Sequence, residues 1–326
     1  MVSAGDLARW AFWVPFRGAL DPHKPKQITR LTQGWRLKKA FAGEQKQLMA
    51  TELEACFGVR GKTEEWINDA YRIMVRAHLE ELLLGKLTSE TWPLHMRFEG
   101  REHLDAALER GKGAILLNPH AGNFMMMIAG VSLAGYPFTQ YAARGLPPEE
   151  MAEAHPEILG HNRFREAARR AREESEDRLP ANFISLTTPV RHLYRCLERN
   201  EVVGLAFDGR IGSRFVLTPF LGRQALLNPG AYRMAATTGA ALVPTLCSVP
   251  HEGPNVCTFG EPIWADKKRG WKGAMEDVLQ QGVEPWLREH PGEYGLWLAH
   301  CRQRAGVDDH PLFIDYAPDD RYKKHL

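Results

Sequence analysis

The spacing of apolar positions changes along the chain, and each change predicts a different element. Between residues 45 and 84 the apolar residues recur at steps of three and four, which is typical of amphipathic helices. A break at residues 58–62, which contains two glycines, divides this stretch into two helices. Residues 113–118 then form a short, largely apolar run typical of a buried strand, and residues 124–133 resemble a helix again. The predicted order is therefore helix, helix, strand, tight turn, helix.

Further apolar runs extend this alternation toward the C-terminus. Residues 138–143, 202–207 and 241–249 have the composition of buried strands. Residues 229–239 favour a helix, because proline stands at the start and glycine at the end. Residues 286–300 are expected to form a helix and loop rich in Trp, Tyr and His. Strands that alternate with helices predict an α/β fold with a mainly parallel central sheet flanked by helices.

Charged and terminal segments fall outside this alternation. Within residues 163–178, five arginines between Arg163 and Arg172 are followed by four acidic residues at 173–177, which indicates a charged helix or an excursion from the sheet. We expect one α/β domain over residues 45–310. Residues 1–44 form an N-terminal aromatic and basic segment, and residues 311–326 are predicted to be a C-terminal tail.

Aromatic residues are concentrated near the N-terminus. Four of them fall within residues 7–16, with cations on either side, and this stretch is too short to span a bilayer. One interpretation is a foot at the membrane surface, where aromatic rings and cations suit the headgroup layer. The other is a first helix that covers the core. The residues concerned are Trp10, Phe12, Trp13 and Phe16, flanked by Arg9 and Arg17.

Composition narrows the class of protein. Lys+Arg 42 against Asp+Glu 40 leaves a net charge of +2, which argues against a nucleic-acid binder held by bulk charge and against a disordered chain. The five cysteines show no CxxC spacing, so neither a disulfide framework nor a metal site is expected. No apolar run reaches the roughly 18 residues of a membrane span, and no signal-peptide cleavage pattern is present. We therefore expect a cytoplasmic location.

The first candidate for chemistry is a histidine that follows a predicted strand. His120 lies just past the run 113–118, and open α/β sheets bind their ligands at the carboxyl ends of strands. Histidine is suited to removing a proton from an attacking hydroxyl or amine at neutral pH. Gly122 would let a substrate approach the backbone, and amides at the start of the next helix would steady an oxyanion. A hydrogen-bonded structural histidine is the alternative.

A second candidate group follows another predicted strand. Asp208 and Arg210 come directly after the run 202–207, as part of Phe207-Asp-Gly-Arg210. They would either pair with each other in a surface turn or hold a phosphate-bearing substrate, to which arginine can bind through two parallel hydrogen bonds.

These motifs together resemble a known family. His120-Ala-Gly-Asn-Phe resembles the H-x-G-N-W block of the lipid A biosynthesis acyltransferases, the bacterial branch of the lysophospholipid acyltransferase superfamily. The resemblance covers roughly residues 45 to 305 and implies a glycerolipid-acyltransferase-like fold. Its later blocks are Asp208-Gly-Arg210, Pro219-Phe-Leu-Gly222, Pro229-Gly230, Thr238-Gly-Ala with Val243-Pro244, and Pro291-Gly-Glu-Tyr-Gly-Leu-Trp297 with His300.

The chain departs from the family pattern beside the histidine. The family motif is H-x4-D/E, in which the carboxylate orients the imidazole, whereas this chain has Met125 at the acidic position. A thioether cannot stabilise the imidazolium that forms when His120 accepts a proton. Three interpretations follow: Asp208 supplies the missing carboxylate, a backbone carbonyl alone supports His120, or the chain has lost acyl transfer and retains binding.

The resemblance implies an acyltransferase with His120 as general base and Asp208 as its catalytic partner. The donor would be a thioester of acyl carrier protein or coenzyme A, and the acceptor a hydroxyl or amine of a lipid-like molecule or metabolite. No cofactor is expected. A non-catalytic acyl-, lipid- or carrier-binding homologue and a thioesterase-like hydrolase are the alternatives. The candidate substrate-binding residues are Asn123, Gly122, Arg144, Arg210 and Met125.

Two of these implications concern particular segments. Met125, Met126 and Met127 would line an adaptable apolar channel for an acyl chain, or else belong to the core. The arginines of residues 163–172 would dock an acidic acyl carrier protein, or else form an ordinary solvated face. The expected site of action is the cytoplasm, with peripheral attachment to the cytoplasmic face of the inner membrane as a further hypothesis.

Overall fold

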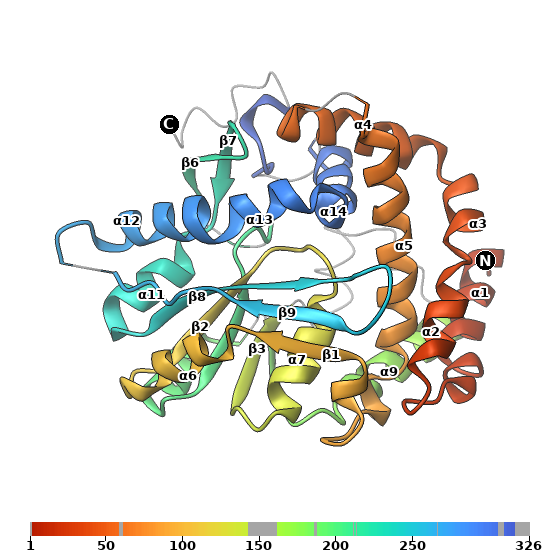
Figure 1. Cartoon of the computed structure of the whole chain (residues 1–326), viewed down its shortest axis with the longest axis horizontal. Helices are drawn as coiled ribbons and strands as arrows, with labels where there is room; N and C mark the ends of the chain where they lie inside the picture. The colour runs from red at the N-terminus through yellow and green to blue at the C-terminus, as the bar shows by residue number, and fades with distance from the viewer. Residues whose placement is uncertain are drawn as a thin grey trace.

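The computed structural model describes residues 2–58, 61–142, 162–185, 188–210, 212, 214–265, 267–305 and 310–316. A seven-stranded sheet forms its centre, in the order β1-β9-β8-β2-β5-β3-β4, beside a two-stranded hairpin of β6 and β7 (Figure 1). The strands are β1 (Met96–Glu99), β2 (Ala114–Asn118), β3 (Phe138–Ala142), β4 (Ala181–Ser185), β5 (Val202–Ala206), β6 (Val216–Phe220), β7 (Arg223–Leu227), β8 (Ala241–Ser248) and β9 (Asn255–Phe259).

Helices cover the sheet and form a separate layer at its side (Figure 1). A π-helical turn over Val278–Val283 joins α12 to α13. The helices are α1 (Ala4–Trp13), α2 (Pro25–Thr32), α3 (Trp35–Ala40), α4 (Gly43–Phe57), α5 (Thr63–Glu81), α6 (Arg101–Glu109), α7 (Phe124–Leu133), α9 (Arg163–Glu176), α10 (Arg191–Glu198), α11 (Gly230–Thr238), α12 (Gly270–Asp277), α13 (Glu284–Glu289) and α14 (Pro291–Gln303).

The predicted α/β class with a mainly parallel sheet is confirmed. Strands β8, β2, β5, β3 and β4 are parallel to their neighbours, and four of them lie where apolar runs predicted strands. The exception to parallel pairing is β9, which is antiparallel to β8 and is followed at the sheet edge by β1. The edge strand β1 reads Met-Arg-Phe-Glu, and such a short, half-polar segment has no run of apolar residues to reveal it.

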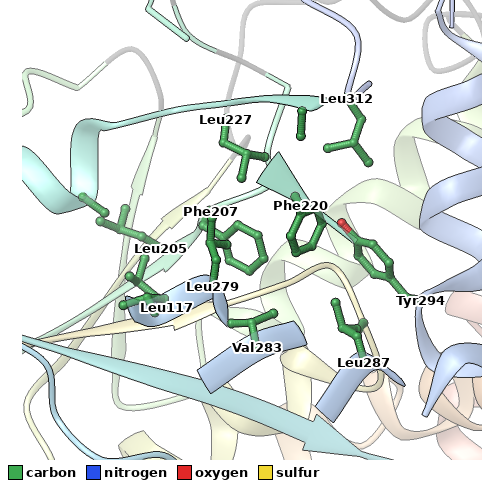
Figure 2. Close-up of a cluster of buried hydrophobic side chains, with 14 of the residues drawn as sticks. Leu117, Leu205, Phe207, Phe220, Leu227, Leu279, Val283, Leu287, Tyr294 and Leu312 are labelled. Carbon is green, nitrogen blue, oxygen red and sulfur yellow. The ribbon is translucent and has the colours of Figure 1, made fainter. Parts of the chain in front are cut away.

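One of the two large clusters of buried hydrophobic side chains lies between the sheet and the hairpin on one side and the C-terminal helices on the other (Figure 2); the second includes the apolar side chains of α7. Phe220 of β6 sits between Phe207 and Tyr294, with ring centroids 5.8 and 6.3 Å away. Leu312 and Phe313, which the sequence placed in a tail, are fully buried here. The amide of Leu226 donates to the carbonyl of Leu312, so residues 310–316 pack on the hairpin.

The N-terminal aromatic residues face the protein. Trp13 is buried, and Phe12 and Phe16 pack against the core cluster that it joins. Trp10 meets Phe164 of α9 edge to face, with ring centroids 5.7 Å apart. These aromatic side chains, in α1 and in the turn that follows it, therefore fit the interpretation of a first helix that covers the core.

Helix α9 is the predicted charged helix. Three of its arginines pair with carboxylates of the same helix, one turn away, and Arg165 pairs with Asp6 of α1. Such pairs neutralise much of the local charge, which favours the interpretation of a solvated face over a docking face for an acidic carrier. The pairs within the helix are Arg169–Glu173, Arg170–Glu166 and Arg172–Glu176.

Within the described ranges, no helix has both the length and the apolar character needed to cross a membrane.

Candidate active site

The candidate site forms where two neighbouring parallel strands end. In the ladder between β2 and β5, Asn118 is paired with Ala206. The amide of Phe207 continues the ladder by donating to the carbonyl of Asn118 at 3.2 Å. His120 and Asp208 each follow the last paired residue of their strand by two positions. This register brings the two side chains together at the carboxyl edge of the sheet, where α/β folds place their ligands.

His120 and Asp208 form a closely bonded pair. Nδ1 of His120 lies 2.7 Å from Oδ1 of Asp208, and the backbone amide of His120 donates to Oδ2 at 3.0 Å. The hydroxyl of Tyr294, which α14 supplies, donates to the same Oδ2 at 2.9 Å. Asp208 is fully buried, whereas the side chain of His120 is 26% exposed. The carboxylate thus holds Nδ1 of the imidazole, while part of the ring stays exposed to solvent.

The surroundings keep Asp208 charged although it is buried. Burial opposes its ionisation, but the imidazole of His120, the amide of His120 and the hydroxyl of Tyr294 together hold the pKa of Asp208 below its usual value. An ionised carboxylate at Nδ1 fixes the tautomer in which Nε2 can accept a proton. The pair thus has the electrostatics of a general base and its orienting acid.

Two aromatic rings fix the plane of the imidazole. Trp297 of α14 stacks on His120 with ring centroids 3.9 Å apart and an interplanar angle of 14°. Phe124, the first residue of α7, meets the imidazole edge to face at 5.7 Å. The face of an indole carries negative potential, so this stack also stabilises a protonated imidazole.

The turn after His120 is packed tightly against two other elements. Gly122 has a φ of +60°, and a Cβ atom there would lie 1.9 Å from the carbonyl oxygen of Cys247. Its amide donates to the carbonyl of Glu293 at 3.2 Å, and the amide of Asn123 donates to the carbonyl of Cys247 at 2.9 Å. These two amides are therefore engaged within the protein. Glycine is required here by protein packing, whatever its part in substrate approach.

A buried polar network holds the start of α7. The side chain of Asn123 caps the helix by accepting from the amide of Met126, and it donates to Oε2 of Glu80 at 2.7 Å. Asn255 of β9 donates to the same oxygen at 2.8 Å, and Arg76 donates to Oε1 at 3.0 Å. The four side chains join α5, the start of α7 and β9 beneath the histidine turn.

Glu293 is a buried ionisable group next to this turn. Its Oε1 accepts from the amide of Val249 at 3.2 Å, and its Oε2 is buried without a hydrogen-bond partner. Burial raises the pKa of Glu293 to about 8, although the nearby arginines Arg72 and Arg76 oppose the shift. This carboxyl group is therefore largely protonated at neutral pH.

The other predicted site residues lie in different surroundings. Arg210 donates to the backbone carbonyls of Asp208 and Leu226, at 3.0 and 2.8 Å, and so ties the β5 loop to the hairpin. Met125 is 5% exposed and belongs to the core cluster, as do Met126 and Met127. Arg144 lies outside the described residues. No group of acidic, His and Cys side chains in the described part of the chain could hold a metal ion.

Sequence reasoning identified His120 and Asp208 but missed the groups around them. Tyr294, Trp297 and Glu293 lie in the C-terminal block Pro291–His300, which was recognised only as a motif. The feature that could have revealed these three residues is the high density of aromatic and polar residues in a single helix. Glu80 gave no signal, because a glutamate in an amphipathic helix is normally solvated.

The chain is thus an α/β protein with a His–Asp pair at the carboxyl ends of two adjacent parallel strands. The chain belongs to the family described as bacterial lipid A biosynthesis acyltransferase, which it matches over residues 22–302. It is also similar to phosphatidylinositol mannoside acyltransferases, with 30% identity over 209 residues to that of Mycobacterium tuberculosis (strain CDC 1551 / Oshkosh). Identity to that of Mycolicibacterium smegmatis (strain ATCC 700084 / mc(2)155) is 32% over 208 residues.

These alignments are partial. The first covers 61% of this chain and 59% of its relative, and the second covers 61% of each protein. The matched stretch thus spans about three fifths of the relatives' length. The comparisons establish the family and do not by themselves assign an acceptor.

Proposed function

We propose that this protein transfers an acyl group from a thioester to a hydroxyl group of a lipid acceptor, with His120 as general base and Asp208 as its orienting acid. The observation that carries the proposal is the contact of 2.7 Å between Nδ1 of His120 and the buried carboxylate of Asp208. This contact supplies the carboxylate that Met125 cannot supply. It supports the first of the three interpretations left open by the sequence.

In the proposed reaction, Nε2 of His120 takes the proton from the acceptor hydroxyl as its oxygen attacks the thioester carbonyl. Asp208 and the face of Trp297 stabilise the imidazolium that results. Collapse of the tetrahedral intermediate breaks the C–S bond, and the imidazolium returns the proton to the leaving thiolate. The products are an ester and a free thiol, and His120 regains its initial state.

The acceptor class follows from the family rather than from the geometry. The family description names lipid A biosynthesis, and the relatives' names contain phosphatidylinositol mannoside. Both are lipids, so we infer an acceptor held in or at a membrane, with the protein acting at the membrane surface. The donor is a thioester of acyl carrier protein or coenzyme A. Asn123, Gly122, Arg144, Arg210 and Met125 remain candidate substrate-binding residues.

The test measures release of free thiol from palmitoyl-coenzyme A and from palmitoyl-acyl carrier protein, with detergent-dispersed lipid acceptors. A lipid A precursor and a phosphatidylinositol mannoside are the first acceptors to try. We expect acceptor-dependent thiol release together with an acylated lipid by mass spectrometry. The His120→Ala variant should be inactive, and an exposed-site control such as Val190→Ser should match the wild type.

Other outcomes distinguish the alternatives. Thiol release with free fatty acid and no acylated lipid would assign a hydrolase. Equal rates in the wild type and His120→Ala would contradict the proposed base. Tight thioester binding without turnover on any acceptor would indicate the non-catalytic homologue, although the hydrogen-bonded His120–Asp208 pair favours chemistry.

A further inference from the structure

Exposed apolar side chains are concentrated in the N-terminal helices. Of the eight large hydrophobic residues that are exposed in the described part of the chain, six belong to the first 41 residues. The two most exposed are Phe41 at 84% and Leu37 at 68%, which lie four positions apart and thus one helical turn from each other. The other four are Val2, Leu7, Val14 and Leu31.

The same segment is strongly basic. Residues 24–43 contain six lysines and arginines and neither aspartate nor glutamate, although the whole chain is nearly neutral. Arg30, Arg36 and Lys38 are exposed, and Arg36 lies over the ring of Trp35 at 5.5 Å. Cations that alternate with exposed apolar residues are unusual on a surface that only meets water.

Helices α2 and α3 pack on the outer side of α5, away from the central sheet (Figure 1). Their inner residues, such as Ile28 and Thr32, are buried, so the helices are anchored to the domain. A hollow beside α3 is lined by Trp35, Arg36 and Lys39, together with Lys46 of α4. A small anionic headgroup would meet a tryptophan and three cations there, of which Lys39 and Lys46 also contact Glu64.

We propose that the α2–α3 surface, formed by Arg30, Leu31, Arg36, Leu37, Lys38 and Phe41, docks the protein on an anionic phospholipid bilayer. Leu37 and Phe41 insert among the lipid chains near the interface, and the cations lie at the phosphate groups. Charge complementarity selects this occupant, because the surface carries Arg30, Arg36 and Lys38 and residues 24–43 contain no acid. This surface differs from the aromatic face of α1, which packs inward. The inference rests on the proposed lipid acceptor.

The experiment is cosedimentation of the full chain with phosphatidylcholine vesicles, with and without phosphatidylglycerol. We expect binding only to the anionic vesicles, and weaker binding at high salt. The double variants Leu37→Ser/Phe41→Ser and Arg36→Glu/Lys38→Glu should each bind at least about tenfold more weakly. Matched controls are Leu94→Ser/Val190→Ser and Arg191→Glu/Arg195→Glu, which change exposed residues elsewhere and should bind as the wild type does.

Several results would overturn the proposal. One is equal binding of the wild type to neutral and anionic vesicles. Another is an equal loss of vesicle binding in the surface variants and in the control variants. The third is a wild-type dimer that the Leu37→Ser/Phe41→Ser substitutions dissociate. The last would assign the surface to a second copy of this chain. If the melting temperature shows that one of the two surface variants folds poorly, vesicle binding by the other surface variant tests the proposal.

Vesicle binding and catalysis are measured separately. The surface variants should keep wild-type thiol release on acceptors dispersed in detergent and lose it on acceptors embedded in anionic vesicles. If no acceptor is acylated, the proposed function fails while vesicle binding still tests the surface.

Discussion

Asp208 determines what His120 can do. Its buried carboxylate accepts from Nδ1 of His120 at 2.7 Å and from the hydroxyl of Tyr294 at 2.9 Å. In a serine-protease triad the acid has the same position relative to histidine, although it comes from a different part of the chain. The family motif H-x4-D/E places this acid five residues after the histidine, at the position of Met125 in α7, whereas here the acid follows the neighbouring strand β5.

Replacing Asp208 by asparagine should therefore lower the rate by about a thousand- to ten-thousandfold, because the amide favours the wrong tautomer and cannot stabilise the imidazolium. Thiol release under saturating donor measures the effect. Tyr294→Phe removes one of the hydrogen bonds to Asp208 and should lower the rate far less than Asp208→Asn does. A rate for Asp208→Asn within a few fold of the wild type would contradict the role of Asp208.

Restoring an acid at position 125 should not raise the rate of acyl transfer. Met125 is 5% exposed in the core cluster, and Asp208 already occupies Nδ1 of His120. The Met125→Glu variant would bury a carboxyl group among apolar side chains, which should destabilise the protein by roughly 3 kcal/mol or more. Chemical denaturation gives the stability, and Met125→Leu is the matched control. A large gain in rate would mean that the native site lacks its acid.

At the scale of elements, the site is a junction of a strand end, a turn and a C-terminal helix. The turn at Gly122 contacts Cys247 at the end of β8 and Glu293 in the first turn of α14. The same helix supplies Tyr294 and Trp297 to the histidine pair. Displacement of the turn would therefore disturb the base, its acid and its stacking partner together.

Gly122→Ala should destabilise the protein by at least about 3 kcal/mol and abolish thiol release, because the new methyl would collide with the backbone of Cys247. Gly135→Ala is the control, since Gly135 also has a positive φ but nothing lies within 4 Å of the added atom. The Gly135→Ala substitution should lower the free energy of unfolding by only about 1–2 kcal/mol. Equal melting temperatures for the two variants would contradict the packing argument.

At the scale of the whole molecule, stability depends on a buried carboxyl group that joins distant segments. Glu293 lies between α14, the histidine turn and the end of β8, and its pKa is raised from 4.5 to about 8. The folded state thus holds a proton that the unfolded chain releases. This contribution to stability is fully present below about pH 4.5 and is lost as the pH rises through about 8.

Glu293→Gln should remove this dependence, because the amide resembles the protonated acid and does not titrate. We expect the melting temperature of the wild type to fall relative to that of the variant as the pH rises from about 5 to 9. Thermal unfolding of both proteins across this range measures the difference. A constant difference between their melting temperatures would show that Glu293 does not titrate in the folded state.

The sequence by itself determined the class of fold and the two residues of the pair. Apolar runs identified four of the five parallel strands, because buried strands of a covered sheet are continuously hydrophobic. It missed β4, whose residues are only partly buried, the edge strand β1 and its neighbour β9, and the hairpin strands β6 and β7. His120 and Asp208 were recognisable because each directly follows such a run.

Only the tertiary structure decided how these residues act. That β2 and β5 are neighbours in this register follows from the packing of the whole sheet, so the contact between His120 and Asp208 is not encoded in either segment alone. Likewise, local sequence could not show which aromatic residues face inward. Trp13 is buried against the core and Phe41 is exposed, although both lie in N-terminal segments with nearby cations. Side-chain burial depends on which elements pack together, and that is a property of the assembled fold.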